Sequence, residues 1–464
     1  MKGYNYWSYA PYRPLLTDVG DIYICRVAPG ENSIHFEWLE GGNEFKIYLK
    51  KRSDKDFVFV GTTTDSQFDI ENLETDTDYE FYVESGTKKS RIRLARCGKS
   101  VGTVVNYLHP DDEAYAFSGR FLCSPSMVRH PDGYLLASMD LYEGSSPQNL
   151  TLIFRSDDDG NTWHYVSELM PSFWGKMFVH KNELYMLSCS TEYGDLLIGK
   201  SSDGGKTFTA PTVLMRGSNG KGGNNGFHKN PQNVVVHRGR IYETLEWGNW
   251  HNGTFYHAAM VMSCDVNDDL LNPENWSFSE PVKYNPKWKG TVDGNASATL
   301  EGTLCVSPDG ELLNIMRYAI GDANPPYGLV LAYRVNTDNP DAPLEYSHSV
   351  KMPCNNSKFM IKYDEKSKKY FSIVSRILEK ENVYRRNLLS LMISDDLENW
   401  ELVCDLIDYR NTDVRKVGFQ YVDFKFEGDD IIFLCRTAIN NANNFHDANY
   451  STFHRIENFR NLIK

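Results

Sequence analysis

The sequence has no paired-cysteine motif and no apolar stretch long enough to cross a membrane. Its nine cysteines are scattered and odd in number, so reduced thiols are expected rather than a disulfide framework. Residues 1–16 contain no apolar core of a secretory leader, and no run reaches about 18 apolar residues. We therefore expect a soluble, cytoplasmic chain, or a secreted or periplasmic one if a signal peptide was removed.

Positive charge is scarce relative to negative charge. The chain has 49 Lys and Arg against 62 Asp and Glu, a formal net charge of −13. This balance argues against nucleic acid and membrane surfaces as main partners, although a local basic pocket could still bind an acidic ligand. No spacing of His and Cys suggests zinc. No segment keeps a 3.6-residue period for long, which leaves an all-β fold.

The first hundred residues are typical of a small β-sandwich. Short apolar runs separated by turn residues alternate from residue 21 to residue 95. Trp38 ends an early strand, and Leu73 precedes Tyr79 by six residues. These features resemble a fibronectin type III module. Residues 1–100 are therefore predicted to form such a domain, with 98–117 as the connection to the rest of the chain.

A repeat with a period near 60 residues fills 115–464. Each unit opens with two apolar strands joined by a tight polar turn, at 126–138, 177–188, 233–245, 303–316, 358–374 and 422–435. Six such units predict a six-bladed β-propeller that carries the active site. Seven blades would result if 246–300 or 318–357 contained another sheet.

A second motif comes after the opening hairpin in two units. Residues 156–163 and 201–208 fit the pattern Ser-x-Asp-x-Gly-x-Thr-Trp/Phe. Degenerate copies lie at Ser263 with 275–276, and at Ser394-Asp395 with 399–400. The Ser and Asp side chains are expected to bind turn amides while Gly supplies a positive φ, so the motif is structural. These copies resemble the Asp boxes (BNR repeats) of the sialidase superfamily, a resemblance that implies a fold and not a reaction.

Three arginines end the second strand of three successive units. Arg317, Arg376 and Arg436 occupy equivalent positions, and equivalent positions in a propeller converge on the same face. Because clustered guanidinium groups repel unless they share an anion, we predict a clamp for a substrate carboxylate. In the alternative interpretation, each arginine pairs with its own local carboxylate.

Loops on the same predicted face carry further polar and aromatic side chains. Trp174 and Trp247 could stack on a sugar ring or simply pack between blades, and His228 could act in catalysis or anchor its loop. The predicted catalytic residues are His228, His446, Tyr450, Tyr421 and Glu301. The predicted substrate-binding residues are Arg317, Arg376, Arg436, Asp140, Trp174, Glu246, Trp247 and Asn449.

The sialidase resemblance implies a Tyr–Glu nucleophile pair, an Asp acid and an arginine triad. Tyr450 or Tyr421 with Glu301 or Glu246 would form the pair, and Asp140 is placed only loosely for the acid. The first-blade arginine is missing, because its place at 123–126 reads Cys-Ser-Pro-Ser. The stretches SPSMVRHPDGYLLAS and DANYSTFHRIENFR are most similar to a sialidase-like branch that includes lyases removing rhamnose from glucuronate. Many relatives of that branch carry His where this chain has Met139.

Elimination next to a uronate needs a neutralised carboxylate, a base and a proton donor, which arginines, His and Tyr supply. We therefore predict a carbohydrate-active enzyme for the acidic end of an oligosaccharide or polysaccharide, with a polysaccharide lyase slightly ahead. The alternatives are an exo-sialidase-type glycoside hydrolase and a glycan-binding propeller without catalysis. No cofactor is required, although Asp447, Asn443 and Asn444 could hold Ca²⁺.

Overall fold

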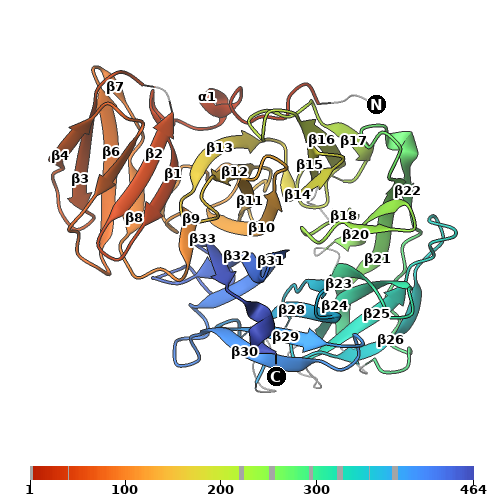
Figure 1. Ribbon diagram of the computed structural model, residues 1–464. Coiled ribbons are helices and arrows are strands. Elements are labelled where there is room, and N and C mark those ends of the chain that lie inside the picture. Colours follow the sequence, from red (N-terminus) through yellow and green to blue (C-terminus); the bar gives the residue numbers. More distant parts are fainter. Residues whose placement is uncertain are drawn as a thin grey trace.

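The computed structural model describes residues 4–39, 41–218, 224–249, 256–291, 296–320, 328–354, 356–378 and 385–463. Nearly all regular structure is β (Figure 1). The helices of this described part are α1 (Arg13–Leu16) and two 3₁₀ turns, Pro273–Asn275 and Phe459–Leu462. None of these helices approaches the length needed to cross a bilayer.

Two sheets form the N-terminal part and pack face to face. One contains β1 (Tyr23–Pro29), β2 (Ile34–Leu39) and β5 (Gln67–Ile70). The other contains β3 (Phe45–Lys51), β4 (Val58–Thr63), β6 (Asp78–Ser85), β7 (Lys88–Lys89) and β8 (Arg93–Arg96). The rings of Phe36 and Phe81 lie 4.7 Å apart across the interface between the sheets. The Tyr79 hydroxyl accepts a hydrogen bond from the Glu74 amide at 2.9 Å, which fixes the turn before β6.

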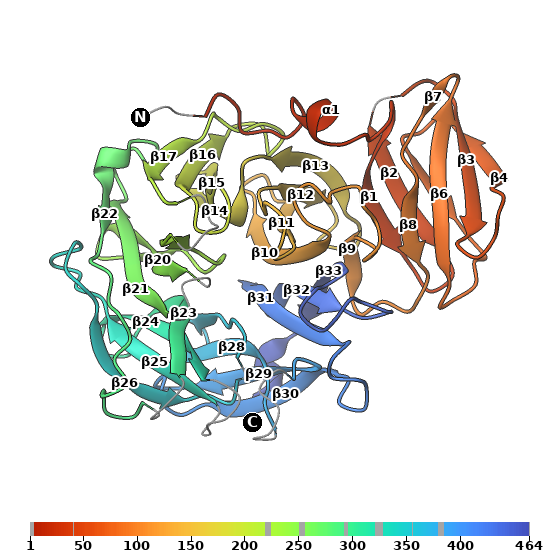
Figure 2. The same ribbon diagram turned by 180° about the vertical axis from the view of Figure 1, so that it is seen from behind.

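The described residues from 103 onward form six further sheets, arranged around a common centre in Figures 1 and 2. The first sheet contains β10 (Phe121–Arg129), β11 (Leu135–Tyr142), β12 (Thr151–Ser156) and β13 (His164–Leu169). The second contains β14 (Phe173–His180), β15 (Glu183–Cys189), β16 (Leu196–Ser201) and β17 (Thr212–Met215). The third contains β18 (Gly226–His228), β19 (Val235–His237), β20 (Arg240–Asn249), β21 (Tyr256–Asp265) and β22 (Trp276–Phe278).

The next two sheets are β23 (Ala296–Val306), β24 (Leu312–Ile320), β25 (Leu329–Arg334) and β26 (Glu345–Lys351), followed by β27 (Ile361–Asp364), β28 (Lys369–Ser375), β29 (Leu388–Ser394) and β30 (Glu401–Asp408). The described parts of 246–300 and 318–357 add no further sheet, because their strands belong to the third and fourth sheets. The predicted alternative of an extra sheet there therefore finds no strands within the described ranges.

The last sheet is completed by a strand from the start of the chain. It contains β31 (Gly418–Glu427), β32 (Asp430–Ala438) and β33 (Tyr450–Ile456), and its fourth strand is β9 (Thr103–Tyr107). The pairing of β9 with β33 gives hydrogen-bonding partners to a strand that would otherwise be an open edge. Because β9 lies before residue 115, the predicted boundary of the second domain falls too late. Sequence periodicity missed β9 because its partners lie some 350 residues later in the chain.

The inner strands of these sheets are buried on both faces because each sheet is covered by its two neighbours, whereas outermost strands such as β30 are partly exposed. Along β11, Leu135, Ala137 and Met139 join a core with Ile432 of the last sheet, whereas Leu136 faces the core shared with the second sheet. Met139 is 1% exposed in that core. Met139 is therefore a packing position in this chain.

Polar side chains fix the outer turns as the sequence predicts. Ser156 accepts a hydrogen bond from the Gly160 amide, and Asp158 accepts one from the Thr162 amide, at 2.8 and 2.9 Å. Gly160 has φ +94° and lies against Phe453 of the last sheet. At the degenerate copy that begins at Ser394, the carboxylate that binds the turn amides is Asp396 rather than Asp395. The prediction was off by one residue there, because Asp395 points outward to Lys369.

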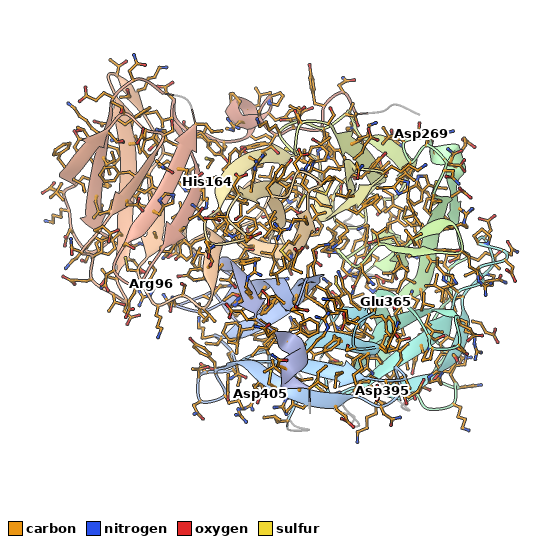
Figure 3. All side chains as sticks on the ribbon, viewed as in Figure 1. Arg96, His164, Asp269, Glu365, Asp395 and Asp405 are labelled. Carbon is orange, nitrogen blue, oxygen red and sulfur yellow. The ribbon has the colours of Figure 1, made fainter. Side chains whose placement is uncertain are left out.

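The N-terminal sheets are joined to the first propeller-like sheet by a buried carboxylate. Glu37 on β2 binds Arg26 at 2.8 Å, the Tyr165 amide at 3.0 Å and His164 at 3.1 Å, the last two on β13. Figure 3 shows His164 at this junction. Burial raises the pKa of Glu37, but the hydrogen bond with His35 and the charge of Arg26 outweigh burial and bring it to about 2.

Replacing Glu37 by Gln should remove a pH-dependent part of the stability. The folded-state pKa lies below the ordinary value of 4.5, so this stability is present above pH 4.5 and is lost as pH falls through about 2. The difference between the two pKa values corresponds to about 3 kcal/mol. Thermal unfolding from pH 7 to pH 2.5 should show E37Q destabilised at pH 7 and converging with wild type in acid. D69N, on the exposed side of β5, should show no such convergence.

Candidate functional site

A cavity of about 400 Å³ opens where the first strands of the sheets converge. The residues that line it come from the first strands, the ends of the second strands and the loops beside them: Cys123, Ser124, Tyr142, Gly144, Trp174, Glu192, His228, Glu301, Arg317, Arg386, Tyr421, Arg436, Phe445 and His446. The first strands of the sheets therefore lie near the centre. Of the predicted site residues, the cavity brings together Trp174, His228, Glu301, Arg317, Tyr421, Arg436 and His446.

A recurring bulge aims four side chains at this cavity. Ser124, Trp174, Glu301 and Tyr421 all have φ between +50° and +56°, and each lies at a register shift between the first two strands of its sheet. A non-glycine residue in this left-handed conformation costs about 1 kcal/mol or more, and such strain concentrates at functional positions. The repeated bulge therefore marks a ring of positions built to face the centre.

Two of these bulge residues form a hydrogen-bonded pair. The Tyr421 hydroxyl donates to Glu301 Oε1 at 2.7 Å, and Arg317 Nη1 donates to Glu301 Oε2 at 2.6 Å. The same Arg317 nitrogen lies 3.3 Å from the Tyr421 oxygen. Burial raises the pKa of Glu301, but Arg317 holds it below its usual value, so this carboxylate stays ionised. Burial and the nearby Glu301 charge raise the pKa of Tyr421, so its proton is kept in the resting state.

Two further guanidinium groups flank the Tyr421 ring. Arg436 lies 5.1 Å and Arg386 lies 5.8 Å from the ring centre. Arg436 donates to the His446 carbonyl, and Arg386 donates to Gln420 and to the Asn356 carbonyl. These are neutral acceptors. Burial and the charges of Arg317 and Arg436 together lower the pKa of Arg386 to about 10, against the opposing effects of Tyr421 and Glu301. The cavity therefore holds positive charge that a bound anion would compensate.

A histidine with a carboxylate behind it also lines the cavity. His228 Nδ1 is 2.6 Å from Glu246 Oε2, and its ring lies 4.3 Å from that of Trp174. Glu246 is fully buried and burial raises its pKa, while the His228 contact opposes this. A carboxylate at Nδ1 fixes the tautomer, so Nε2 of neutral His228 carries the lone pair. His228 can therefore exchange a proton with a ligand in the cavity.

The second predicted histidine, His446, lies in the loop between β32 and β33, whose residues hydrogen-bond to one another. Its Nδ1 lies 3.0 Å from Asp447 Oδ1, and its ring meets Tyr142 edge-on at 5.2 Å. Burial and the charge of Arg436 lower the pKa of His446 to about 4. His446 is therefore neutral near pH 7 and is suited to hydrogen bonding rather than to donating a proton as an acid.

Asp447 is surrounded by hydrogen-bond donors. Asn443 and Asn444 each donate their side-chain amide to Asp447 Oδ2 at 2.7 Å. Calcium would need the oxygens of these amides rather than their nitrogens. Within the described ranges, no group of three or more His, Cys, Asp or Glu side chains could hold a metal ion. Calcium at this loop stays a prediction.

Arg376 does not join the cavity, which corrects the predicted trio of arginines. Its guanidinium binds both oxygens of Asp405, at 2.6 and 2.9 Å, and Ser390. Asp405 lies on the outermost strand of its sheet, near the edge of the molecule in Figure 3. The alternative interpretation, a local carboxylate partner, therefore describes Arg376. The third guanidinium of the cavity belongs to Arg386, in the loop before β29.

Other predicted residues lie outside the cavity lining and support it from behind. Tyr450 is fully buried against Tyr107, and Asn449 binds the backbone of Ile439. Trp247 packs edge-on against Phe227. Trp247 on β20 and Tyr450 on β33 are therefore corrected to packing positions, and Asn449, in the loop before β33, is corrected to a loop-closing position.

Asp140 is likewise buried behind the cavity. It accepts hydrogen bonds from Thr151 at 2.5 Å and from the Gly175 amide at 3.3 Å, and burial raises its pKa to about 7. It holds the bulge that presents Trp174. Glu246 has the corresponding supporting position behind His228.

Sequence reasoning missed Arg386, Glu192, Tyr142 and Phe445. Arg386 and Glu192 lie in loops that join the second and third strands of their sheets, where the repeat register already places ligand-facing groups. Tyr142 is the last residue of β11, and Arg436 occupies a similar position near the end of β32. Comparing the equivalent positions of every repeat, rather than those of three repeats alone, could have identified these residues from the sequence.

No family model matches the chain, and no curated protein matches it. Among solved structures, it is similar to a protein of unknown function from Dyadobacter fermentans (12% identity, TM-score 0.53), covering 77% of this chain and 98% of that one. It is also similar to the Hadza microbial sialidase Hz136 (11% identity, TM-score 0.50; 95% and 94% covered).

The chain has the fold of a sialidase. An α-L-arabinanase from Penicillium chrysogenum shares this fold as well (12% identity, TM-score 0.50; 77% and 98% covered). Since the identities are this low, the sialidase fold is what the comparisons establish. The predicted resemblance is confirmed at that level, and the narrower lyase-containing branch stays a prediction.

Proposed function

We propose that this protein is a carbohydrate-active enzyme that cleaves a glycosidic bond at a terminal acidic sugar, with Tyr421 as the attacking group. The observation that carries the proposal is the 2.7 Å hydrogen bond from the Tyr421 hydroxyl to the ionised Glu301 carboxylate. A phenol is a weak nucleophile until an adjacent base removes its proton, and Glu301 is placed to do so. The sialidase fold supports the same reaction class.

The reaction can be derived from the positions of the groups. Tyr421 attacks the anomeric carbon, its proton passes to Glu301, and the bond from that carbon to the leaving oxygen breaks. The leaving oxygen takes a proton from a cavity group, and Glu192 and His228 both line the cavity. Water then attacks the same carbon and gives its proton to the group that protonated the leaving oxygen. The bond from that carbon to the Tyr421 oxygen breaks, and the released phenolate takes its proton back from Glu301. Arg317 stabilises negative charge on both Glu301 and the Tyr421 oxygen.

The substrate is acidic because the cavity has guanidinium groups in excess of carboxylates beside Tyr421. Among the described residues, the hydrogen-bond acceptors of Arg386 and Arg436 are neutral, so a carboxylate placed between them would replace weaker hydrogen bonds by charged ones. Arg317 remains bound to Glu301.

Elimination is the second candidate, favoured by the His228–Glu246 pair on the same cavity. With its tautomer fixed, His228 could remove the proton next to a uronate carboxylate while Tyr421 protonates the departing oxygen. The sequence alone placed this reaction first. The Tyr421–Glu301 contact reverses the order, because an elimination needs no base bound to the proton donor.

The deciding experiment is a panel of fluorogenic glycosides of sialic acid, glucuronic acid and their neutral counterparts. Release from an acidic member, without an ultraviolet-absorbing unsaturated product, is the expected result. An unsaturated product would favour elimination. Binding without turnover across the panel would instead favour a glycan-binding propeller and would overturn the enzyme proposal.

Replacing Arg386 by Met should weaken binding of the acidic substrate, raising KM about 10-fold to 200-fold with a smaller change in kcat. Loss of a charge-assisted contact of about 1.5–3 kcal/mol sets this range. R376M is the matched control, since Arg376 binds Asp405 outside the cavity, and its KM should stay near wild type. Equal effects of the two variants would contradict the proposed carboxylate site.

The finer architecture is also a proposal. We infer six blades, closed by β9, and an N-terminal module of fibronectin type III type that packs on the first blade. The sheet orders β1-β2-β5 and β4-β3-β6, together with the Tyr79 contact to the turn before its strand, support the module.

A further inference from the structure

A second cavity, of about 220 Å³, lies at the other end of the same inner strands. On β10, Ser124 lines the first cavity and Arg129 lines the second. On β31, Tyr421 lines the first and Lys425 lines the second. Because a strand advances about 3.3 Å per residue, about 13 Å separates the two positions on β31. The two cavities are therefore distinct sites at opposite ends of the centre.

Four cations line this second cavity: Arg129, Lys176, Lys362 and Lys425. Arg129 lies 3.1 Å from Glu427 and 2.7 Å from the exposed Asp159. Lys176 lies 2.5 Å from the buried Asp423. Each of these two cations is therefore compensated by a carboxylate at the edge or the floor of the cavity.

Lys362 and Lys425 have no such compensation. Across the described ranges, neither ammonium group has a hydrogen bond or an ion pair, and Lys362 Nζ lies 5.5 Å from the Phe424 ring centre. Burial lowers the pKa of both lysines, and the charge of Lys176 adds to this at each, while Asp423 opposes it. The charge of Lys425 also lowers the pKa of Lys362, and Glu427 opposes the lowering at Lys425. Lys358, further inside, has its pKa lowered by burial to about 7. Within the described ranges, Lys362 and Lys425 thus lie close to other positive charges while neither forms an ion pair.

We propose that this cavity is a binding site for a doubly charged oxyanion, phosphate or sulfate, held by Lys362 and Lys425 with Lys176 and Arg129 beside them. Within the described part of the chain, two of the four lining basic side chains form no ion pair with a carboxylate, and this number matches the charge of a dianion. A tetrahedral oxyanion offers acceptors in several directions, as ammonium groups arriving from different strands require. The site is independent of the reaction proposed for Tyr421.

Thermal unfolding of the full chain with added sodium phosphate or sodium sulfate tests this site, with sodium chloride at matched ionic strength as reference. Wild type should show a saturable rise in Tm of about 2 °C or more. The K362M/K425M variant should begin at a higher Tm, because repulsion is relieved, and should lose the saturable rise. K206M, at an exposed lysine, should respond as wild type does. Separate phosphate and sulfate titrations identify which anion binds more tightly.

Two results would overturn the proposal. An equal, non-saturating rise in wild type and K362M/K425M would be a general salt effect. Loss of the response in R386M would place the anion in the first cavity. If K362M/K425M does not fold, acetylation of wild-type lysines followed by mass spectrometry replaces it. Phosphate should slow labelling of Lys362 and Lys425 at least about 5-fold and leave Lys206 unchanged, and equal labelling with and without phosphate contradicts the site.

Discussion

Replacing Tyr421 by Phe should abolish turnover, lowering kcat/KM by about 10³-fold or more, with little change in stability. Loss of a nucleophile acting with its base removes at least about 4 kcal/mol of transition-state stabilisation. Glu301→Gln should give a similar loss, since Tyr421 would keep its proton. The measurement is the initial rate on whichever acidic glycoside the panel identifies.

The control is Tyr142→Phe, which removes another phenol from the same cavity. Tyr142 contacts Arg436 and His446 through its ring, so this variant should lose less than about 10-fold. Mass spectrometry of acid-quenched wild type should show one glycosyl group on a peptide containing Tyr421. A rapid turnover with no such adduct, together with an active Y421F, would rule out the displacement and leave elimination at His228.

Replacing Asp423 by Asn should destabilise the protein by about 3–5 kcal/mol, the range for breaking a buried ion pair. Asp423 is fully buried and binds Lys176 at 2.5 Å and the Met127 amide at 2.8 Å. These contacts join the inner strands β10, β14 and β31. Its loss would leave Lys176 as an uncompensated buried charge beside Lys358 and Lys362. Urea unfolding at pH 7 measures the change.

The second-site variant D423N/K176M should recover much of the lost stability, because it removes the stranded cation along with its partner. Lys366→Met is the control for an ion pair at the surface. Lys366 pairs with Asp429, and both side chains are exposed. That variant should change stability by less than about 1 kcal/mol. No recovery in the double variant would show that the Met127 contact, rather than the ion pair, carries the effect.

The repeat alone determined much of this fold. Apolar hairpins every 60 residues, joined by turns that need Gly, Asp and Asn, led to sheets packed on one another around a centre, because each hairpin must bury both of its faces. The same register correctly brought Arg317, Arg436, Glu301 and Tyr421 to one cavity, since equivalent positions of a repeat occupy equivalent places in space.

Tertiary structure decided what the register could not. Arg376 and Arg386 are ten residues apart and chemically alike, and the position of Asp405 on the outermost strand β30, together with Ser390 on β29, holds the first one outside the cavity. Tyr421 and Tyr450 were interchangeable as candidates, but a bulge turns Tyr421 to the centre while regular pairing turns Tyr450 into the core. The closing strand β9 depended on a partner about 350 residues away. These outcomes depend on contacts between distant segments, and local sequence carries no record of such contacts.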